Sequence, residues 1–114
     1  MNIEEIKNKL GAELLYGEQH LKHQLEYCFA SDLMSDVLTL ETEDPLLITG
    51  LTNPQCLRTA EMADLRCIIF ARNKPINKEI INLARELDIT ILRSKFSVFK
   101  ISGILYQSGM KPIF

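Results

Sequence analysis

Short polar segments directly follow apolar runs in this sequence, and they hold most of the residues that could bind a ligand. There are four such segments: Ser31-Asp32, Thr49 to Asn53, Arg72-Asn73 and Arg93-Ser94. Hydroxyl, amide and guanidinium groups bind anions, and a glycine lets the backbone approach a ligand closely. The candidate ligand-binding residues are Ser31, Asp32, Thr49, Gly50, Thr52, Asn53, Arg72, Asn73 and Ser94, with Arg93 as a further cation.

The same residues also suit helix caps and turns. Ser, Thr, Asn and Asp accept hydrogen bonds from the first free amides of a helix, and Gly is frequent in turns. Every member of the set has such a structural role available. The residue types alone therefore favour caps and turns over a pocket, and both interpretations stay open.

Two further pairs have a spacing that could hold a metal ion. Asp32 and Asp36 would share one face of a helix and could hold Mg²⁺ with a substrate phosphate, although Asp32 as a helix cap is the favoured interpretation. His20 and His23 could share a metal, but no third ligand is evident, and a solvated loop is favoured. We predict no metal and no cofactor.

Catalytic signatures are missing from the sequence. It has no Gly-x-x-x-x-Gly-Lys-Ser/Thr, Gly-x-Gly-x-x-Gly or Gly-x-Ser-x-Gly motif. Cys28, Cys56 and Cys67 form no Cys-x-x-Cys pair and have no evident histidine partner, so each is interpreted as a free, largely buried thiol. The chain is therefore not expected to be an enzyme.

Charge and hydropathy exclude several classes of protein. The 13 basic and 15 acidic residues give a net charge of −2 without a basic run, which argues against general nucleic-acid binding. Apolar stretches are far shorter than the roughly 20 residues needed to cross a bilayer. The N-terminus is acidic, unlike a signal peptide, and we expect no membrane contact and a cytoplasmic location.

Helices and strands alternate along the sequence. Asn2 and Glu5 predict a capped helix over 3–10, and a second helix of about eight residues would follow a Ser31-Asp32 cap, burying Leu33, Met34, Val37 and Leu38. Asn53-Pro54 and Asn77 begin two more helices. Ser94 begins a last helix, which contains Phe96, Phe99, Ile101 and Leu105 and ends near Gly109. Strands are predicted at Glu13–Tyr16, Glu26–Ala30, Leu46–Thr49, Cys67–Phe70 and Ile89–Leu92.

This alternation predicts one domain over residues 1–114. Strands that are apolar at successive positions and joined through helices form parallel sheets, with helices on both faces. The fold class is therefore α/β, in three α/β/α layers with a mostly parallel sheet of four to five strands. Ligands in such sheets bind beyond the carboxyl ends of the strands, where the polar segments would lie.

Several separated phrases of the sequence resemble the stand-alone branch of the DRTGG-domain family. They are Ala30 to Leu38, Leu47 to Gln55, Arg58 to Asp64 and Phe99 to Gly109. The resemblance implies a fold similar to the N-terminal domain of HPr kinase, a noncatalytic regulatory role and a tendency to form homodimers. The Asp-Arg and Thr-Gly-Gly phrases that name the family are absent near Thr49–Asn53 and Ala71–Lys74, and Ser102 stands where the branch commonly has Cys.

Two functional hypotheses follow. The first is a homodimeric sensing module that binds a small anionic ligand or nucleotide at the polar segments. The second is an interaction domain that docks on a partner enzyme or sensor kinase without a small molecule. Apolar candidates for that contact are Met110, Ile113 and Phe114 at the tail.

Overall fold

A six-stranded sheet forms the middle layer of the computed structural model, which describes all 114 residues. Its strand order is β1-β5-β4-β3-β2-β6. Strands β2 to β5 are parallel neighbours, β6 is parallel to β2, and β1 is antiparallel to β5 at the other edge. The strands are β1 (Glu13–Tyr16), β2 (Tyr27–Ala30), β3 (Leu46–Thr49), β4 (Cys67–Phe70), β5 (Thr90–Arg93) and β6 (Lys111–Pro112).

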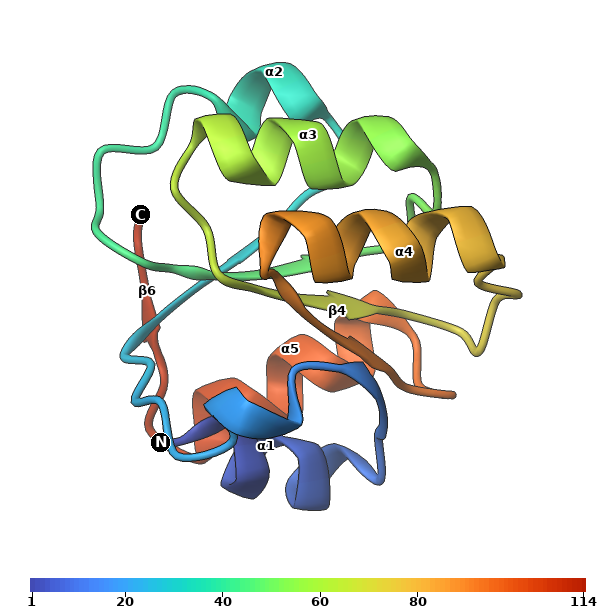
Figure 1. Cartoon of the computed structure of the whole chain (residues 1–114). Coiled ribbons are helices and arrows are strands. Elements are labelled where there is room, and N and C mark those ends of the chain that lie inside the picture. The colour runs from blue at the N-terminus through green and yellow to red at the C-terminus, as the bar shows by residue number, and fades with distance from the viewer.

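Helices cover both faces of this sheet, so the predicted three-layer α/β/α fold is confirmed. Helices α2, α3 and α4 lie on one face, and α1 and α5 lie on the other (Figure 1). None of them combines the length and apolar character that crossing a bilayer requires. The helices are α1 (Ile3–Leu10), α2 (Met34–Val37), α3 (Pro54–Met62), α4 (Lys78–Leu87) and α5 (Val98–Gln107), and a 3-10 turn, η1, spans Glu18–His20.

The core is divided by the sheet into two layers of apolar side chains. Successive strand residues point to opposite faces, so Ile69 and Leu92 join the layer beneath α1 and α5, whereas Ile68 and Ile91 join the layer beneath α3 and α4. All residues of β3 and β4 are buried, as the uninterrupted apolar runs predicted. Burying one Leu or Ile side chain fully stabilises the fold by about 1.5–3 kcal/mol.

Three predicted helix starts are confirmed by their caps. The Asn2 side chain accepts from the Glu5 amide at 2.8 Å, and the Glu5 carboxylate accepts from the Asn2 amide at 3.0 Å. Asn53 accepts from the Cys56 amide at 3.1 Å, with proline at the first helical position. Asn77 caps α4 in the same way, with the Ile80 amide at 3.0 Å.

The predicted eight-residue helix after Ser31-Asp32 is wrong. Helix α2 is a single turn of four residues, and only Val37 in it is fully buried. Leu33 and Leu38, predicted to face inward, are 58% and 48% exposed. The cause is local, because the Ser31 hydroxyl accepts from the Leu33 amide and fixes a turn where a helix was expected to begin.

The predicted start of the last helix is also wrong, although Ile101 and Leu105 are buried on it as expected. Helix α5 begins at Val98, with Ser97 as its cap, and Phe99 is 88% exposed rather than buried. Ser94 still belongs to the extended chain after β5, because its amide donates to the Phe70 carbonyl. At the tail, Met110 is buried against the core, contrary to expectation, whereas Phe114 is exposed beside Phe29.

Two strand boundaries differ from the prediction by one residue. Strand β2 begins at Tyr27 rather than Glu26, and β5 spans Thr90 to Arg93 rather than Ile89 to Leu92. The shift in β5 arises because helix α4 ends on Asp88 in a left-handed conformation, which places Ile89 in the turn.

Candidate functional site

The four polar segments lie along one edge of the sheet. Strands β2 to β5 are parallel and in register, with Thr49 beside Phe70 and Phe70 beside Arg93, so their carboxyl ends meet at the same edge. This edge lies at the right of Figure 1, where α3 and α4 begin. We call it the rim, and it comprises residues 31–32, 49–53, 72–74 and 93–95.

Asp32 ties the first two segments of the rim together. Its Oδ1 accepts a hydrogen bond from the Thr49 hydroxyl at 2.9 Å and another from the Gly50 amide at 2.7 Å. The Lys74 ammonium donates to the Gly50 carbonyl from the next segment. Because Asp32 lies before α2, it shares no helical face with Asp36, and the spacing considered for Mg²⁺ does not arise.

Arg72 and Asn73 form an exposed turn in the middle of the rim. Both residues have left-handed backbones, with φ of 67° and 51°. Their amides donate to the carbonyls of Phe96 and Ser94 at 2.8 Å, which joins this turn to the segment after β5. Neither side chain makes a hydrogen bond within the chain, so a guanidinium and an amide face outward from a fixed turn.

Other predicted site residues serve the fold instead. Ser94 is fully buried, and its hydroxyl bonds the Leu10 carbonyl at 3.3 Å and the Phe96 amide at 3.2 Å. Thr49 is equally buried, between Asp32 and the Leu51 amide. The Arg93 guanidinium pairs with Glu13 at 2.6 Å, so this charge is directed toward β1.

The beginning of α3 leaves polar atoms free at the rim. The Asn53 oxygen caps the helix, whereas its NH₂ group makes no hydrogen bond within the chain. The Thr52 side chain makes none either, and both residues are half-buried. Ser31 lies at the outer end of the rim and uses its hydroxyl in the local turn with Leu33.

Gly50 occupies a position that the fold itself does not reserve for glycine. Its φ lies outside the left-handed region, and a Cβ there would meet the Lys74 ammonium at 3.4 Å and the Asp32 carboxylate at 3.5 Å, both close to ordinary contact. Gly50 is itself buried, and its amide and carbonyl are already engaged by Asp32 and Lys74.

Positive charge gathers along the rim, and the site predicted from the sequence did not include three of the five cations, Lys74, Lys95 and Lys100. The Lys95 and Lys100 ammonium groups both lie over the Phe96 ring, at 5.9 Å and 4.0 Å from its centre. Lys74 reaches the Gly50 carbonyl in the neighbouring segment of the rim. The cations at this edge are Arg72, Lys74, Arg93, Lys95 and Lys100, against the carboxylates of Glu13 and Asp32.

The cysteines are poorly suited to nucleophilic chemistry. Cys56 and Cys67 are buried and Cys28 is partly buried, and all three are free thiols as predicted. Burial raises the pKa of Cys28 and of Cys56 to about 12, and it raises the pKa of Cys67 as well. The reactive thiolate form is therefore almost absent near neutral pH.

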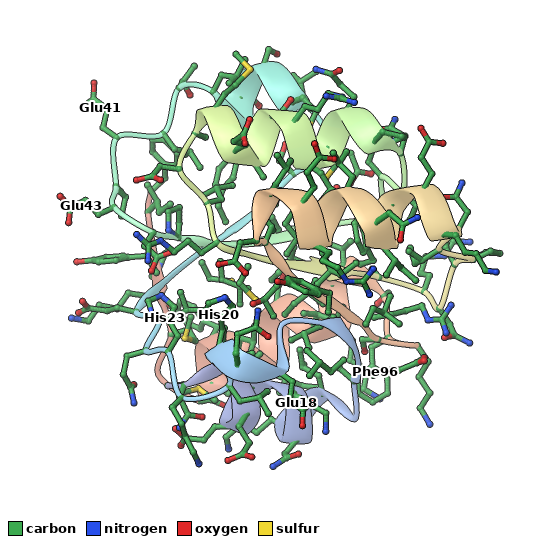
Figure 2. The ribbon with its side chains drawn as sticks, in the orientation of Figure 1. Glu18, His20, His23, Glu41, Glu43 and Phe96 are labelled. Atoms are coloured by element: carbon green, nitrogen blue, oxygen red, sulfur yellow. The ribbon has the colours of Figure 1, made fainter.

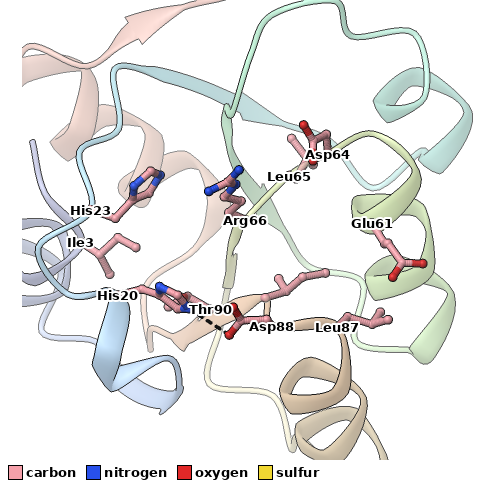
Figure 3. A pocket seen from close by; sticks show the side chains of 11 residues that line it. Ile3, His20, His23, Glu61, Asp64, Leu65, Arg66, Leu87, Asp88 and Thr90 are labelled. Atoms are coloured by element: carbon pink, nitrogen blue, oxygen red, sulfur yellow. Dashed lines mark hydrogen bonds and ion pairs between the residues drawn. The ribbon is translucent and has the colours of Figure 1, made fainter.

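The opposite edge of the sheet, where the parallel strands begin, holds a cavity of about 210 Å³ (Figure 3). None of the predicted site residues lines it. His20 and His23, expected in a solvated loop, both reach its wall and pair with carboxylates: His20 with Asp88 at 2.9 Å, and His23 with Asp44. The lining residues are Ile3, His20, His23, Glu61, Asp64, Leu65, Arg66, Leu87, Asp88, Ile89 and Thr90.

Comparison with known proteins gives one family and one fold. The family model described as the DRTGG domain matches residues 5–108. Among solved structures, the chain is similar to the CBS and DRTGG domains of the regulatory region of Clostridium perfringens pyrophosphatase, complexed with the activator diadenosine tetraphosphate. The TM-score is 0.71 at 19% identity, over 94% of this chain and 46% of that one, so the chain spans about half of its length. No curated protein matches.

Proposed function

Because the chain belongs to the DRTGG-domain family, we propose that it is a noncatalytic regulatory module. It binds a small anionic ligand, with nucleotides as the leading class, and the rim is the binding site. Binding shifts the population of the module between states, and this shift is passed on to whatever protein the module contacts.

The observation that carries this proposal is the unpaired positive charge along a turn with a fixed backbone. The Arg72 guanidinium has no partner within the chain, and Lys74 and Lys95 lie in the same and the adjacent segment. A ligand phosphate would replace water around these cations and gain charge-assisted hydrogen bonds. The regulatory region of the similar pyrophosphatase was crystallised with a nucleotide activator, which supports the choice of ligand class.

Neutral groups of the rim would complete the contact. Thr52 and the Asn53 NH₂ group lie at the amino end of α3, where the helix dipole favours negative charge. Asp32 would orient Gly50 and Thr49 rather than touch an anion, because its carboxylate is already engaged by both.

Titration calorimetry tests this proposal with ATP, diadenosine tetraphosphate and acetyl phosphate as probes. We expect at least one probe to bind, and Arg72→Ala to weaken binding by about tenfold to a hundredfold, the effect of losing one charge-assisted hydrogen bond. Arg58→Ala is the matched control. Arg58 is an exposed arginine of α3 that lies beside Glu79 and Glu86 of α4 and is not part of the rim. The absence of binding at millimolar concentrations, or equal losses in both variants, would refute the proposal.

Homodimer formation is the second part of the proposal, and an exposed face of α5 supports it. Phe99 is 88% exposed and Tyr106 is 68% exposed, and they are seven positions apart, so both lie on one side of the helix. Gly103 lies between them, and nothing within 4 Å would meet a Cβ there. A helical glycine costs about 0.5–1 kcal/mol relative to alanine, and close packing of a second copy would account for it.

The alternative function, docking on a partner enzyme or sensor kinase, would use the same uncharged face. Light scattering separates the two at micromolar concentration. A homodimer gives twice the chain mass of 13.0 kDa. A monomeric mass would contradict the dimer and leave the face to a different protein.

A further inference from the structure

We propose that helix α5 pairs with α5 of a second copy in an antiparallel arrangement, in which Phe99 of each copy enters an apolar groove beside Tyr106 of the other. This inference rests on the homodimer part of the proposed function. It adds the side chains that meet, their register along the helix, and the groove that each copy supplies to its partner.

An apolar groove runs between α5 and the strands β2, β3 and β6 at one end of the sheet order. Ile48, Leu105, Met110 and Pro112 contribute apolar walls, and Lys111 is the one charged residue of the lining. The groove has a volume of about 170 Å³. An apolar cavity of about 150 Å³ holds one benzene ring, so this groove matches a single phenyl side chain in size.

The groove is continuous with the exposed face of α5. Phe99, Ser102, Gly103 and Tyr106 follow the spacing of three, four and seven positions that places residues on one side of a helix. Two of them, Ser102 and Tyr106, also line the groove. Phe99 does not line it and is the most exposed aromatic side chain of the helix. Each copy therefore presents one free phenyl ring and, two turns further along the same face, one groove of matching size.

Twofold symmetry brings the ring and the groove together. In an antiparallel pair of identical helices, a residue before the crossing point faces the residue that is equally far beyond it in the other copy. Phe99 and Tyr106 are equally far from the point between Ser102 and Gly103. A crossing there puts each Phe99 beside the other copy's Tyr106, at the groove. The two residues at the crossing are small, which lets the helix axes approach closely.

Charge and area both favour a second copy as the occupant. Residues near a twofold axis meet their own counterparts, so a charge there would repel itself. Lys100 is the only charged residue of α5, and its ammonium lies over the Phe96 ring at 4.0 Å, beside the rim.

The area available is that of a modest interface. An aromatic side chain buries about 150–250 Å², so Phe99 and Tyr106 of two copies, scaled by their exposed fractions of 88% and 68%, would bury roughly 500–800 Å². Stable interfaces begin at about 1,200 Å² in total. The aromatic side chains thus supply about half of that area, and the groove walls and the remaining surface of α5 supply the rest.

Disulfide cross-linking between copies tests the register. A mixture of Phe99→Cys and Tyr106→Cys protein should form covalent dimers under mild oxidation, because the two positions lie side by side across the interface. Either variant alone should not, since two copies of one position would lie about 10 Å apart along the helix, beyond the reach of about 7 Å between Cα atoms. The native cysteines are partly or fully buried and do not interfere. Glu86→Cys mixed with Tyr106→Cys is the control and should stay unlinked, because Glu86 is exposed on α4.

Sedimentation equilibrium of Phe99→Ala supplies a second readout. Dimerisation should weaken by about a hundredfold, because each dimer loses two buried phenyl rings, whereas the fold should be unaffected by the loss of an exposed side chain. Leu33→Ala is the matched control, an exposed apolar residue that does not lie on α5.

The outcomes separate this inference from the homodimer itself. A wild-type mass of 13.0 kDa at micromolar concentration overturns both. A wild-type dimer that keeps its affinity in Phe99→Ala, or in which Phe99→Cys alone cross-links as readily as the mixture, overturns the antiparallel α5 pairing and leaves a homodimer formed through another surface.

Discussion

At the scale of single residues, the rim depends on contacts that tie one segment to another. The Asp32 carboxylate holds the Thr49 hydroxyl and the Gly50 amide, and Ser94 joins the end of β5 to the Leu10 carbonyl at the end of α1. Both residues were selected from the sequence as parts of a site, and both lie at the rim. Their side chains, however, are committed to the fold.

Replacing Asp32 by Asn should therefore lower stability more than it alters chemistry. One charge-assisted acceptor for two donors is lost, and we expect the free energy of unfolding to fall by about 1–2 kcal/mol in urea titration. Asp36→Asn is the control, because Asp36 is exposed and its carboxylate makes no hydrogen bond within the chain. Equal effects of the two substitutions would show that the Asp32 contacts contribute nothing to stability.

The thiols give a second residue-scale prediction. With a pKa of about 12, Cys28 and Cys56 hold only about one thiolate in ten thousand at pH 8. A disulfide reagent that absorbs in the visible should therefore label native protein at least a thousandfold more slowly than protein in concentrated urea. Rapid labelling of a single cysteine in the folded state would contradict the burial of these side chains.

At the scale of helices and strands, the sequence predicted the features that depend on residues close together in the chain. The Asn2, Asn53 and Asn77 caps act over three residues, and the buried strands are continuous apolar runs, so both were found. The length of α2 and the start of α5 were wrong, since side-chain contacts that the residue types do not reveal decide them. Ser31 fixes a local turn with Leu33 before α2, Asp32 bonds residues 17 and 18 positions away, and Ser94 bonds one 84 positions away.

Helix α5 provides a prediction at this scale. Gly103→Ala should stabilise the monomer by about 0.5–1 kcal/mol, because alanine favours the helix and the added Cβ meets nothing. If a second copy packs on this face, the same substitution should weaken dimerisation when measured by sedimentation equilibrium. Glu86→Ala, at an exposed position of α4 on the other face of the sheet, is the control and should leave association unchanged. A dimer unaffected by Gly103→Ala would place the interface elsewhere.

At the scale of the whole molecule, the parallel sheet separates charge between its two edges. Helices α3, α4 and α5 begin at the carboxyl edge, where Arg72, Lys74 and Lys95 lie, whereas α3 and α4 end at the amino edge. Figure 2 shows Glu41 and Glu43 on the side of the molecule opposite Phe96, a residue beside the rim. The net charge of −2 hides this separation, which needs the strand order to become visible. The sequence located the rim through the rule for parallel sheets but could not locate the cavity, whose walls come from η1 and from the ends of α3 and α4.

The most direct test of the rim as a binding site is an NMR titration of isotope-labelled protein with a nucleoside triphosphate. The amide signals of Gly50 to Asn53 and of Arg72 and Asn73 should shift in a saturable way, whereas those of His20 and Asp88 at the opposite edge should stay in place. Shifts centred on the amino edge, or no saturable shift at millimolar nucleotide, would contradict anion binding at the rim.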